Sequence, residues 1–192
     1  MPPNVTETYK RVEARDRKKW RAWLEKNHAH SPGVWLVFYK KTSGKPTVRY
    51  DEAVEEALCF GWIDSLMKPV DDARYRQLFT PRKAKSRWSK PNKERVARMI
   101  AAGLMTDTGM EKIRAAKKDG TWTHMDAPDS LAVPPDLRKA LNANKAARES
   151  FGRMPSGKKR QLLGWIHDAK RPETRQRRIA QVVEIAAGTR SI

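Results

Sequence analysis

The apolar run at residues 34–39 constrains the fold of this chain more than any other feature. Its six residues, VWLVFY, are β-branched or aromatic apart from one leucine, and such side chains favour strands. Turn-forming residues lie on both sides of it, at 32–33 and 42–44. A short run that is apolar at every position is typical of a strand covered on both faces. The pattern therefore predicts a buried central strand with Trp35 and Phe38 in the interior.

Two helices are expected to flank that strand in the sequence. At residues 15–27, apolar side chains recur at the spacing of one helix face. At residues 51–60, the apolar positions again share one face, and Glu52, Glu55 and Glu56 are expected to face the solvent. Both segments therefore predict short amphipathic helices.

A β-hairpin is predicted next. Residues 62–68 and 74–79 have the composition of strands, and the segment between them, PVDD at 69–72, has turn chemistry. We therefore expect an α+β fold in which a small antiparallel sheet of three strands is packed by helices. The second half of the chain shows helical periodicity, so an all-helical C-terminal subdomain is expected to follow.

Shifts in composition predict where these parts begin and end. Residues 1–14 show no periodicity and are expected to form a loose N-terminus, and residues 15–120 are expected to form the α+β domain. Proline and aspartate are frequent at 121–134, which predicts a connector. The helical C-terminal subdomain is expected at 135–192.

A basic segment follows the hairpin and carries the clearest functional signal. The chain has 41 lysines and arginines against 22 aspartates and glutamates, a net charge of +19 that favours a polyanion such as nucleic acid or an acidic protein. Basic side chains around the aromatic Trp88 can hold phosphates while the ring stacks on a base. The residues predicted to bind anions are Arg82, Lys83, Lys85, Arg87 and Lys90. The alternative is a solvated basic loop in which Trp88 has a structural role.

A second prediction concerns a pocket beside the hairpin. Alternation along a strand places Trp62 and Asp64 on the same side of residues 62–68. An aromatic wall with one carboxylate and one cation suits a small polar ligand. The pocket is predicted to contain Trp62, Asp64, Ser65, Lys68 and Trp88. The alternative is that Asp64 forms a structural ion pair with a basic side chain such as Arg82.

The other reactive side chains form no recognisable catalytic or metal motif. His28 and His30 lie in one turn, but no cysteine or carboxylate cluster completes a metal site, so we expect no metal, no other cofactor and no catalytic residue. The single cysteine, Cys59, lies in an apolar stretch and is expected to be a buried thiol. The N-terminal sequence has no secretory signal, and no run is long and apolar enough for a membrane span. A cytoplasmic protein is therefore expected.

Several stretches resemble a known family when they are taken together in order. They are residues 23–28 (WLEKNH), 33–37 (GVWLV), 50–58 (YDEAVEEAL), 61–65 (GWIDS), 79–83 (FTPRK), 86–90 (SRWSK) with Asn92, and 170–175 (KRPETR). The chain in this respect resembles the YdeI/OmpD-associated family, often described as bacteriocin-protection proteins. The resemblance covers most of residues 15–187.

This resemblance implies a link to survival of bacteriocins or antimicrobial peptides, an outer-membrane porin as partner, and a periplasmic location for some members. Together with the residue chemistry, it leads us to expect a non-enzymatic binding or stress-protection protein that uses a basic, Trp-containing surface for an anionic partner. Two alternatives stay open at this point: a nucleic-acid-binding module, and an enzyme of unknown reaction with a pocket around Trp62 and Asp64. Salt separates them, because phosphate binding weakens steeply with salt and catalysis on a neutral substrate does not.

Overall fold

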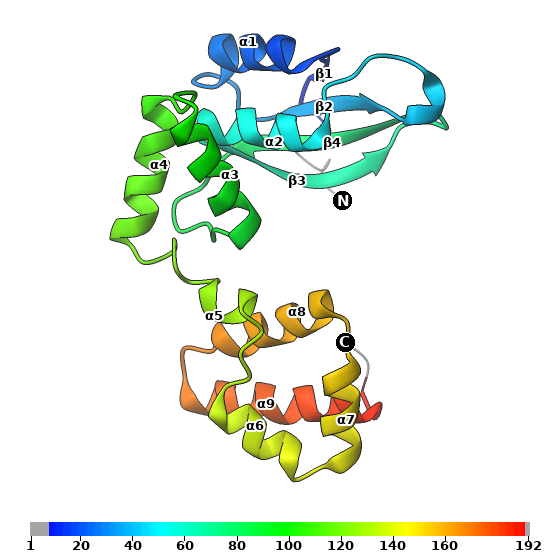
Figure 1. The fold of residues 1–192 in the computed structure, drawn as a ribbon, viewed down its shortest axis with the longest axis vertical. Helices are drawn as coiled ribbons and strands as arrows, with labels where there is room; N and C mark the ends of the chain where they lie inside the picture. The colour runs from blue at the N-terminus through cyan, green and yellow to red at the C-terminus, as the bar shows by residue number, and fades with distance from the viewer. Residues whose placement is uncertain (1–7, 191–192) are drawn as a thin grey trace. The chain divides into compact units, whose positions relative to one another are not determined.

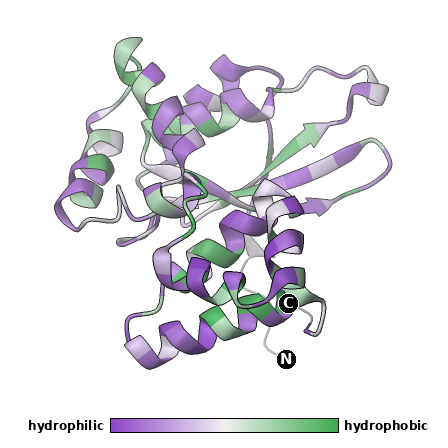
Figure 2. Cartoon of the chain, turned by 60° about the horizontal axis from the view of Figure 1, so that its bottom comes forward, coloured by the Kyte–Doolittle hydropathy of each residue, from purple (hydrophilic) through white to green (hydrophobic). Residues whose placement is uncertain are grey.

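The computed structural model describes residues 8–190, and Figure 1 shows how their helices and strands are arranged. Of these residues, those up to Trp122 form one compact unit, and those from Thr123 onward form a second. Each unit has a hydrophobic cluster of its own. In Figure 2 the helices carry both hydrophobic and hydrophilic stretches, as expected for helices that are buried on one side only.

The N-terminal unit is built on a mixed sheet of four strands in the order β1-β2-β4-β3. The strands are β1 (Arg11–Glu13), β2 (Val34–Tyr39), β3 (Trp62–Pro69) and β4 (Arg74–Pro81). β1 runs parallel to β2, whereas β4 pairs antiparallel with both β2 and β3. The register places Val34 opposite Phe79, and the pairing of β3 is irregular between Asp64 and Met67.

The predicted α+β class is confirmed, and the sheet has one strand more than expected. Residues 11–13 lie in the segment expected to be loose, yet they form β1; residues 1–7 of that segment lie outside the described residues. A strand of three residues gives too short a periodic signal to be separated from a loop. Trp35 and Phe38 are 0% and 1% exposed, which confirms the predicted interior strand.

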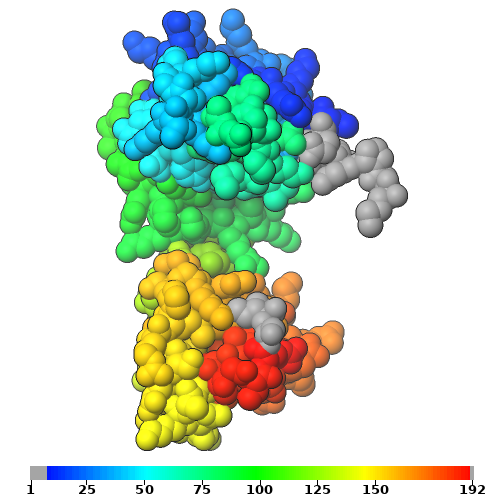
Figure 3. Space-filling view, turned by 90° about the vertical axis from the view of Figure 1, so that its right-hand side faces the viewer, coloured from blue at the N-terminus to red at the C-terminus, as the bar shows by residue number. Residues whose placement is uncertain are grey.

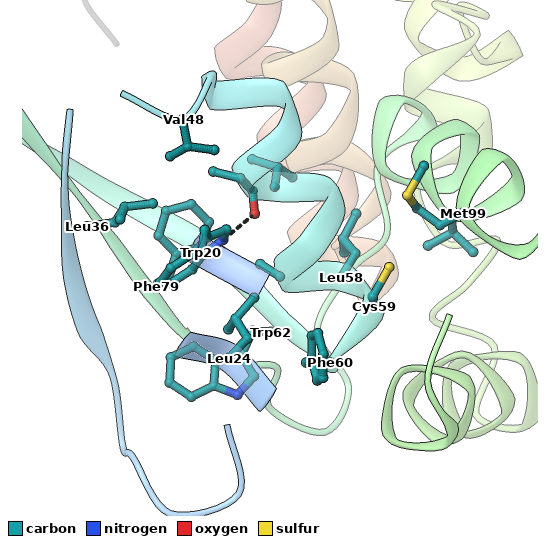
Figure 4. Packing of buried hydrophobic residues seen from close by; sticks show 14 of the residues in the cluster. Trp20, Leu24, Leu36, Val48, Leu58, Cys59, Phe60, Trp62, Phe79 and Met99 are labelled. Carbon is teal, nitrogen blue, oxygen red and sulfur yellow. Dashed lines mark hydrogen bonds between the residues drawn. The ribbon is translucent and has the colours of Figure 1, made fainter. Parts of the chain in front are cut away.

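Helices α1 (Arg17–Asn27) and α2 (Tyr50–Cys59) pack on the same face of the sheet. Trp20 of α1 joins the two helices, because its indole Nε1 donates a hydrogen bond to the Ala53 carbonyl of α2 at 3.0 Å. Figure 4 shows this bond and the position of the Trp20 ring beside Leu36 and Phe79 of the sheet. The core of the unit therefore lies between the sheet and these helices.

The structure corrects the expected exposure of Glu55 and Glu56, which are buried at the contact of α2 with α1 and with α3 (Lys90–Ala101). Glu56 accepts hydrogen bonds from Arg17 Nε at 2.5 Å and from Arg21 Nη1 at 2.7 Å. Glu55 accepts from Arg17 Nη1 and Arg98 Nη2, both at 2.9 Å. Periodicity alone places these carboxylates on a polar helix face, and it does not reveal that arginines from two other helices cover that face. We call these five residues the Arg–Glu network.

Helix α4 (Asp107–Lys118) is held close to the end of α2 by two glycines and a threonine. Thr106 Oγ1 donates to the Cys59 carbonyl at 2.5 Å, and a Cβ at Gly109 would collide with that same oxygen. Gly61 turns the chain from α2 into β3 with a φ of 71°, and a Cβ there would lie 2.9 Å from the Lys112 side chain of α4. These close approaches fix α4 beside the start of β3.

The C-terminal unit consists of helices. They are α5 (Asp126–Asp129), α6 (Pro135–Asn142), α7 (Lys145–Arg153), α8 (Ser156–His167) and α9 (Pro172–Ala187). α5 lies inside the segment expected to be a connector. Figure 3 shows α7 (yellow) and α9 (red) side by side. Arg175 of α9 donates to Asp136 of α6 at 2.6 and 3.0 Å, so this arginine ties two helices together.

No helix in residues 8–190 is long and apolar enough to cross a membrane. The same range contains no group of three or more histidine, cysteine, aspartate or glutamate side chains that could hold a metal ion.

Candidate anion-binding site

The segment between β4 and α3 folds over a cavity of about 120 Å³ in the N-terminal unit. One wall comes from this segment and the other from α4 and the residues just after it. The lining residues are Arg82, Lys83, Ala84, Lys85, Ser86 and Trp88 on the first wall, and Lys112, Ala115, Ala116, Asp119 and Thr121 on the second. We call this space the Arg82 cavity.

Arg82 is the buried cation of the cavity and is 3% exposed. Its backbone amide donates to the Gly61 carbonyl at 2.9 Å, which fixes the residue just past the end of β4. Its guanidinium carbon lies 3.8 Å from the centroid of the Trp88 ring, and Nη2 donates to the Arg87 carbonyl at 2.6 Å. Nε and Nη1 are also buried, and none of the described residues accepts a hydrogen bond from them. Arg82 therefore brings a positive charge with two unused donors to the wall of the cavity.

Burial makes this charge unfavourable in the absence of an anion. It lowers the pKa of Arg82 to about 10, and the negative charge of Asp64 offsets part of this effect. Because that pKa is still well above neutrality, the side chain is a cation at physiological pH. Taking an ion out of water costs several kcal/mol unless a counter-charge and hydrogen bonds compensate. An anion in the cavity would supply both.

Further charges line the same cavity. Lys83 and Lys85 are exposed, and Lys112 of α4 is half-buried. Asp119 accepts hydrogen bonds from the Thr121 amide at 3.0 Å and the Thr121 hydroxyl at 2.5 Å. These bonds, with the nearby charge of Lys85, hold the pKa of Asp119 below its ordinary value. The lining therefore carries four basic side chains against one engaged carboxylate.

Trp88 has the buried position expected of the structural alternative to base stacking. Trp88 is 2% exposed, because Arg82 covers its ring and Trp122 packs against it with 5.0 Å between centroids. Trp122 itself is half-buried, and the ammonium groups of Lys93 and Lys117 lie 5.9 and 5.4 Å from its ring centroid. The aromatic group nearer to the solvent is therefore Trp122, whereas the buried ring of Trp88 packs against the guanidinium group of Arg82.

The five residues predicted to bind anions take three kinds of position. Arg82, Lys83 and Lys85 line the cavity. Arg87 is exposed and contributes its backbone carbonyl to Arg82. Lys90 is exposed and forms the first residue of α3. The structure thus brings three of the five together around one space.

Two residues of the predicted Trp62 pocket lie on the helix-covered face of the sheet. Trp62 is part of the core, and its indole Nε1 donates to the His28 carbonyl at 3.1 Å. Asp64 accepts from the Tyr50 hydroxyl at 2.7 Å and from the Gln77 amide at 3.2 Å. Burial, together with the Asp64 bond, raises the pKa of Tyr50. Asp64 therefore has structural partners, a tyrosine and a glutamine.

The remaining members of that pocket lie elsewhere. Ser65 is exposed on β3, and its hydroxyl donates to the Leu78 carbonyl at 3.5 Å. Lys68 lies over the Trp35 ring, 5.9 Å from its centroid, on the opposite face of the sheet from α1 and α2. Of the five residues predicted for the pocket, Trp88 alone lines the Arg82 cavity. The structure does not bring these five residues together.

Sequence reasoning missed the α4 wall of the cavity. Lys112, Ala115, Ala116 and Asp119 follow one another at the spacing of a single helix face, which marks them as neighbours. That pattern does not say which other segment faces them. A lysine, two alanines and an aspartate are also what a solvated helix surface commonly carries, so the stripe gave no functional signal.

Two family models match the chain. Residues 12–112, just over half of the chain, match the family described as Domain of unknown function (DUF8412). Residues 130–188 match the family described as Bacteriocin-protection, YdeI or OmpD-Associated, which confirms the resemblance to that family for this part of the chain. No curated protein and no solved structure matches significantly.

Proposed function

We propose that this chain, which belongs to the DUF8412 family, is a non-enzymatic binding protein that holds an anionic group of its partner in the Arg82 cavity. One observation carries the proposal: Arg82 is 3% exposed, and no described residue accepts a hydrogen bond from its Nε or Nη1. Buried polar groups in folded proteins are almost always hydrogen-bonded, and an exception calls for a reason. An acceptor supplied by a partner is that reason here.

The groups around Arg82 favour binding over catalysis. Asp119 is engaged by Thr121, and its lowered pKa makes it a weak base. The Thr121 hydroxyl donates a hydrogen bond to Asp119, and because the pKa of Asp119 is lowered, this carboxylate is a poor base for activating the hydroxyl as a nucleophile. None of the described residues that line the cavity is a histidine. Arg82, Lys83, Lys85 and Lys112 act as hydrogen-bond donors and positive charges, which is the chemistry of anion recognition.

The C-terminal unit supports a protective role for this binding. The family that matches residues 130–188 is named for bacteriocin protection and OmpD association. A chain with a net charge of +19 repels cationic peptides, so we infer that it does not capture them directly. Protection would instead come from occupying an anionic target that such a peptide attacks. We place this role in the cytoplasm, where the buried free thiol of Cys59 is stable.

Fluorescence anisotropy across a salt series tests the anionic partner. Single-stranded and duplex oligonucleotides are expected to bind more weakly as salt rises, and neutralising a lysine that contacts a phosphate should reduce the slope by about one. The informative variants are Lys83→Gln and Lys85→Gln. Lys118→Gln is the matched control, because Lys118 is exposed on α4 but lies outside the cavity lining. Polyglutamate serves as an acidic-protein probe, and absence of binding to all three ligands at low salt would refute the proposal.

A survival assay tests the protective role. Host cells that lack the gene are expected to be more sensitive to a bacteriocin or a cationic antimicrobial peptide, and the wild-type chain should restore resistance. Arg82→Met, expressed at the same level, should not restore it, whereas Lys118→Gln should. If both variants restore resistance equally, the protective role does not depend on the Arg82 cavity.

A further inference from the structure

The Arg82 cavity is smaller than the sites that usually enclose a drug-sized ligand. Its volume is about 120 Å³, whereas sites that enclose complete small-molecule ligands measure roughly 300–1,000 Å³. The space exists because α4 presents Ala115 and Ala116 where longer side chains would fill it. A single tetrahedral anion fits such a space.

Because Arg82 is buried, the cavity can distinguish a phosphate at the end of an anionic chain from one in its middle. An internal phosphodiester has chain on both sides, so it passes across a surface and cannot enter a small recess. Arg82 is 3% exposed, while Lys83 and Lys85 of the same lining are exposed. A phosphate at the end of a chain can reach the buried guanidinium while the rest of the chain stays among the exposed lysines.

The charges of the cavity also favour a dianion. Arg82, Lys83, Lys85 and Lys112 line it against Asp119. A phosphate monoester carries a charge of about −1.5 to −2 at neutral pH and presents three acceptor oxygens. An internal diester has a single negative charge and two free oxygens. Nε and Nη1 of Arg82 are two buried donors that no described residue uses, and additional acceptors could engage them.

We propose that the Arg82 cavity recognises a terminal phosphate monoester at the end of a nucleic-acid strand. This inference rests on the proposed function, since it names the anionic group that the cavity holds. The strand is favoured over a small phosphorylated metabolite because three exposed basic residues follow Arg82 in the sequence and could contact the next phosphates of a strand. They are Lys83, Lys85 and Arg87.

Two single-stranded oligonucleotides of one sequence test the proposal. Both carry a 3′ fluorophore, and one has a 5′-phosphate where the other has a 5′-hydroxyl. Anisotropy titrations with the full chain at one moderate salt concentration should show about tenfold or tighter binding of the phosphorylated strand, as expected for charge-assisted hydrogen bonds to a buried arginine. Excess inorganic phosphate should remove the difference.

Two variants locate the effect in the cavity. Arg82→Met removes the donors, and Ala115→Leu fills the space from an exposed position of α4 without changing the charge. Each should abolish the preference for the 5′-phosphate, so that the variant binds the two strands with equal affinity. Lys118→Met removes one charge from α4 outside the cavity. It should weaken the binding of both strands equally and keep the preference for the 5′-phosphate. Thermal unfolding verifies that each variant is folded.

The outcomes distinguish terminal-phosphate recognition from the broader anionic-partner function. Equal binding of both strands by the wild type, with a steep salt dependence, would overturn terminal-phosphate recognition and leave the anionic-partner function standing. Binding of neither strand, with no competition by phosphate, would overturn both. If glycerol 3-phosphate binds as tightly as the phosphorylated strand, the monoester chemistry is supported and the strand is overturned as its source.

Discussion

The arginines of the Arg–Glu network and the buried Arg82, all in the N-terminal unit, differ in how their charge is balanced. In the Arg–Glu network, Arg17 and Arg21 both donate to Glu56, and Arg17 also donates to Glu55. Arg82 is more deeply buried than either, yet Nε and Nη1 find no acceptor among the described residues. Carboxylates from the same chain make the first group a structural element. Around the buried donors of Arg82 none of the described residues supplies such an acceptor, and on the proposed function a partner would supply it.

The largest effect is expected from a substitution in the Arg–Glu network. Glu56→Gln removes the carboxylate that Arg17 and Arg21 share, and leaves two partly buried cations short of an acceptor. We expect the free energy of unfolding to fall by about 3 kcal/mol, measured by urea denaturation. Glu25→Gln is the control, because Glu25 is exposed and meets Arg21 at 3.3 Å; its expected loss is under about 1 kcal/mol. Equal losses would show that the network contributes no more than a surface pair.

A smaller effect is expected in the C-terminal unit, where the carboxylate of the pair is exposed: the Asp136 side chain is 45% exposed, whereas that of Glu56 is 1% exposed. Arg175 holds the pKa of Asp136 below its ordinary value through two hydrogen bonds. Because the pKa is lowered in the folded state, this stabilisation is fully present above the ordinary carboxyl pKa, about 4, and is lost as the pH falls below it. Arg175→Met should lose about 1 kcal/mol at neutral pH after solvent screening is allowed for. Urea denaturation at neutral and acidic pH should show the difference between wild type and variant shrinking in acid.

The unbalanced arginine is expected to respond in the opposite direction. Arg82→Met removes an uncompensated buried charge and gives up the bond to the Arg87 carbonyl. Without ligand, we expect the free energy of unfolding to be unchanged or higher by up to about 1 kcal/mol. Added phosphate should raise the melting temperature of the wild type and not that of the variant, because a ligand stabilises only a state that binds it. A loss as large as that of Glu56→Gln would show that Arg82 is a structural residue.

The smallest effect concerns the thiol beside the balanced group. Burial, assisted by the charge of Glu56, raises the pKa of Cys59 to about 11. The folded protein should therefore react slowly with Ellman's reagent at pH 8 and rapidly once it is unfolded. Since the folded pKa is raised, the contribution to stability is present below the ordinary thiol pKa and is lost as the pH rises from about 9 towards 11. Rapid reaction of the folded protein would contradict the burial of Cys59.

The parts of the fold that could be predicted from sequence are those with a local signal. The apolar run of β2 and the turn between β3 and β4 depend on neighbouring residues, and both were predicted within a few positions. β1 has three residues, so its pairing with β2 depends on a contact that leaves no periodic trace. Glu55 and Glu56 follow the same rule, since their burial depends on arginines of α1 and α3.

The candidate site likewise has one part with a local sequence signal and one part without. Arg82, Lys83 and Lys85 stand out in sequence because basic residues cluster around Trp88, and their role in anion binding stays a prediction. The wall formed by Lys112 and the two alanines of α4 lies about thirty residues further along the chain. Its position depends on the packing of α4 against the end of α2, which a single sequence does not encode in any local pattern.

Gly61 connects the two walls of the Arg82 cavity. Its carbonyl accepts the hydrogen bond from the Arg82 amide at 2.9 Å, and the space where a Cβ would lie is next to the Lys112 side chain. A displacement of this turn would therefore affect both walls. On the proposed function, a ligand would enter a cavity whose two walls are already held together. Association should then be governed by diffusion and long-range charge attraction, with little loss of affinity to the ordering of the chain.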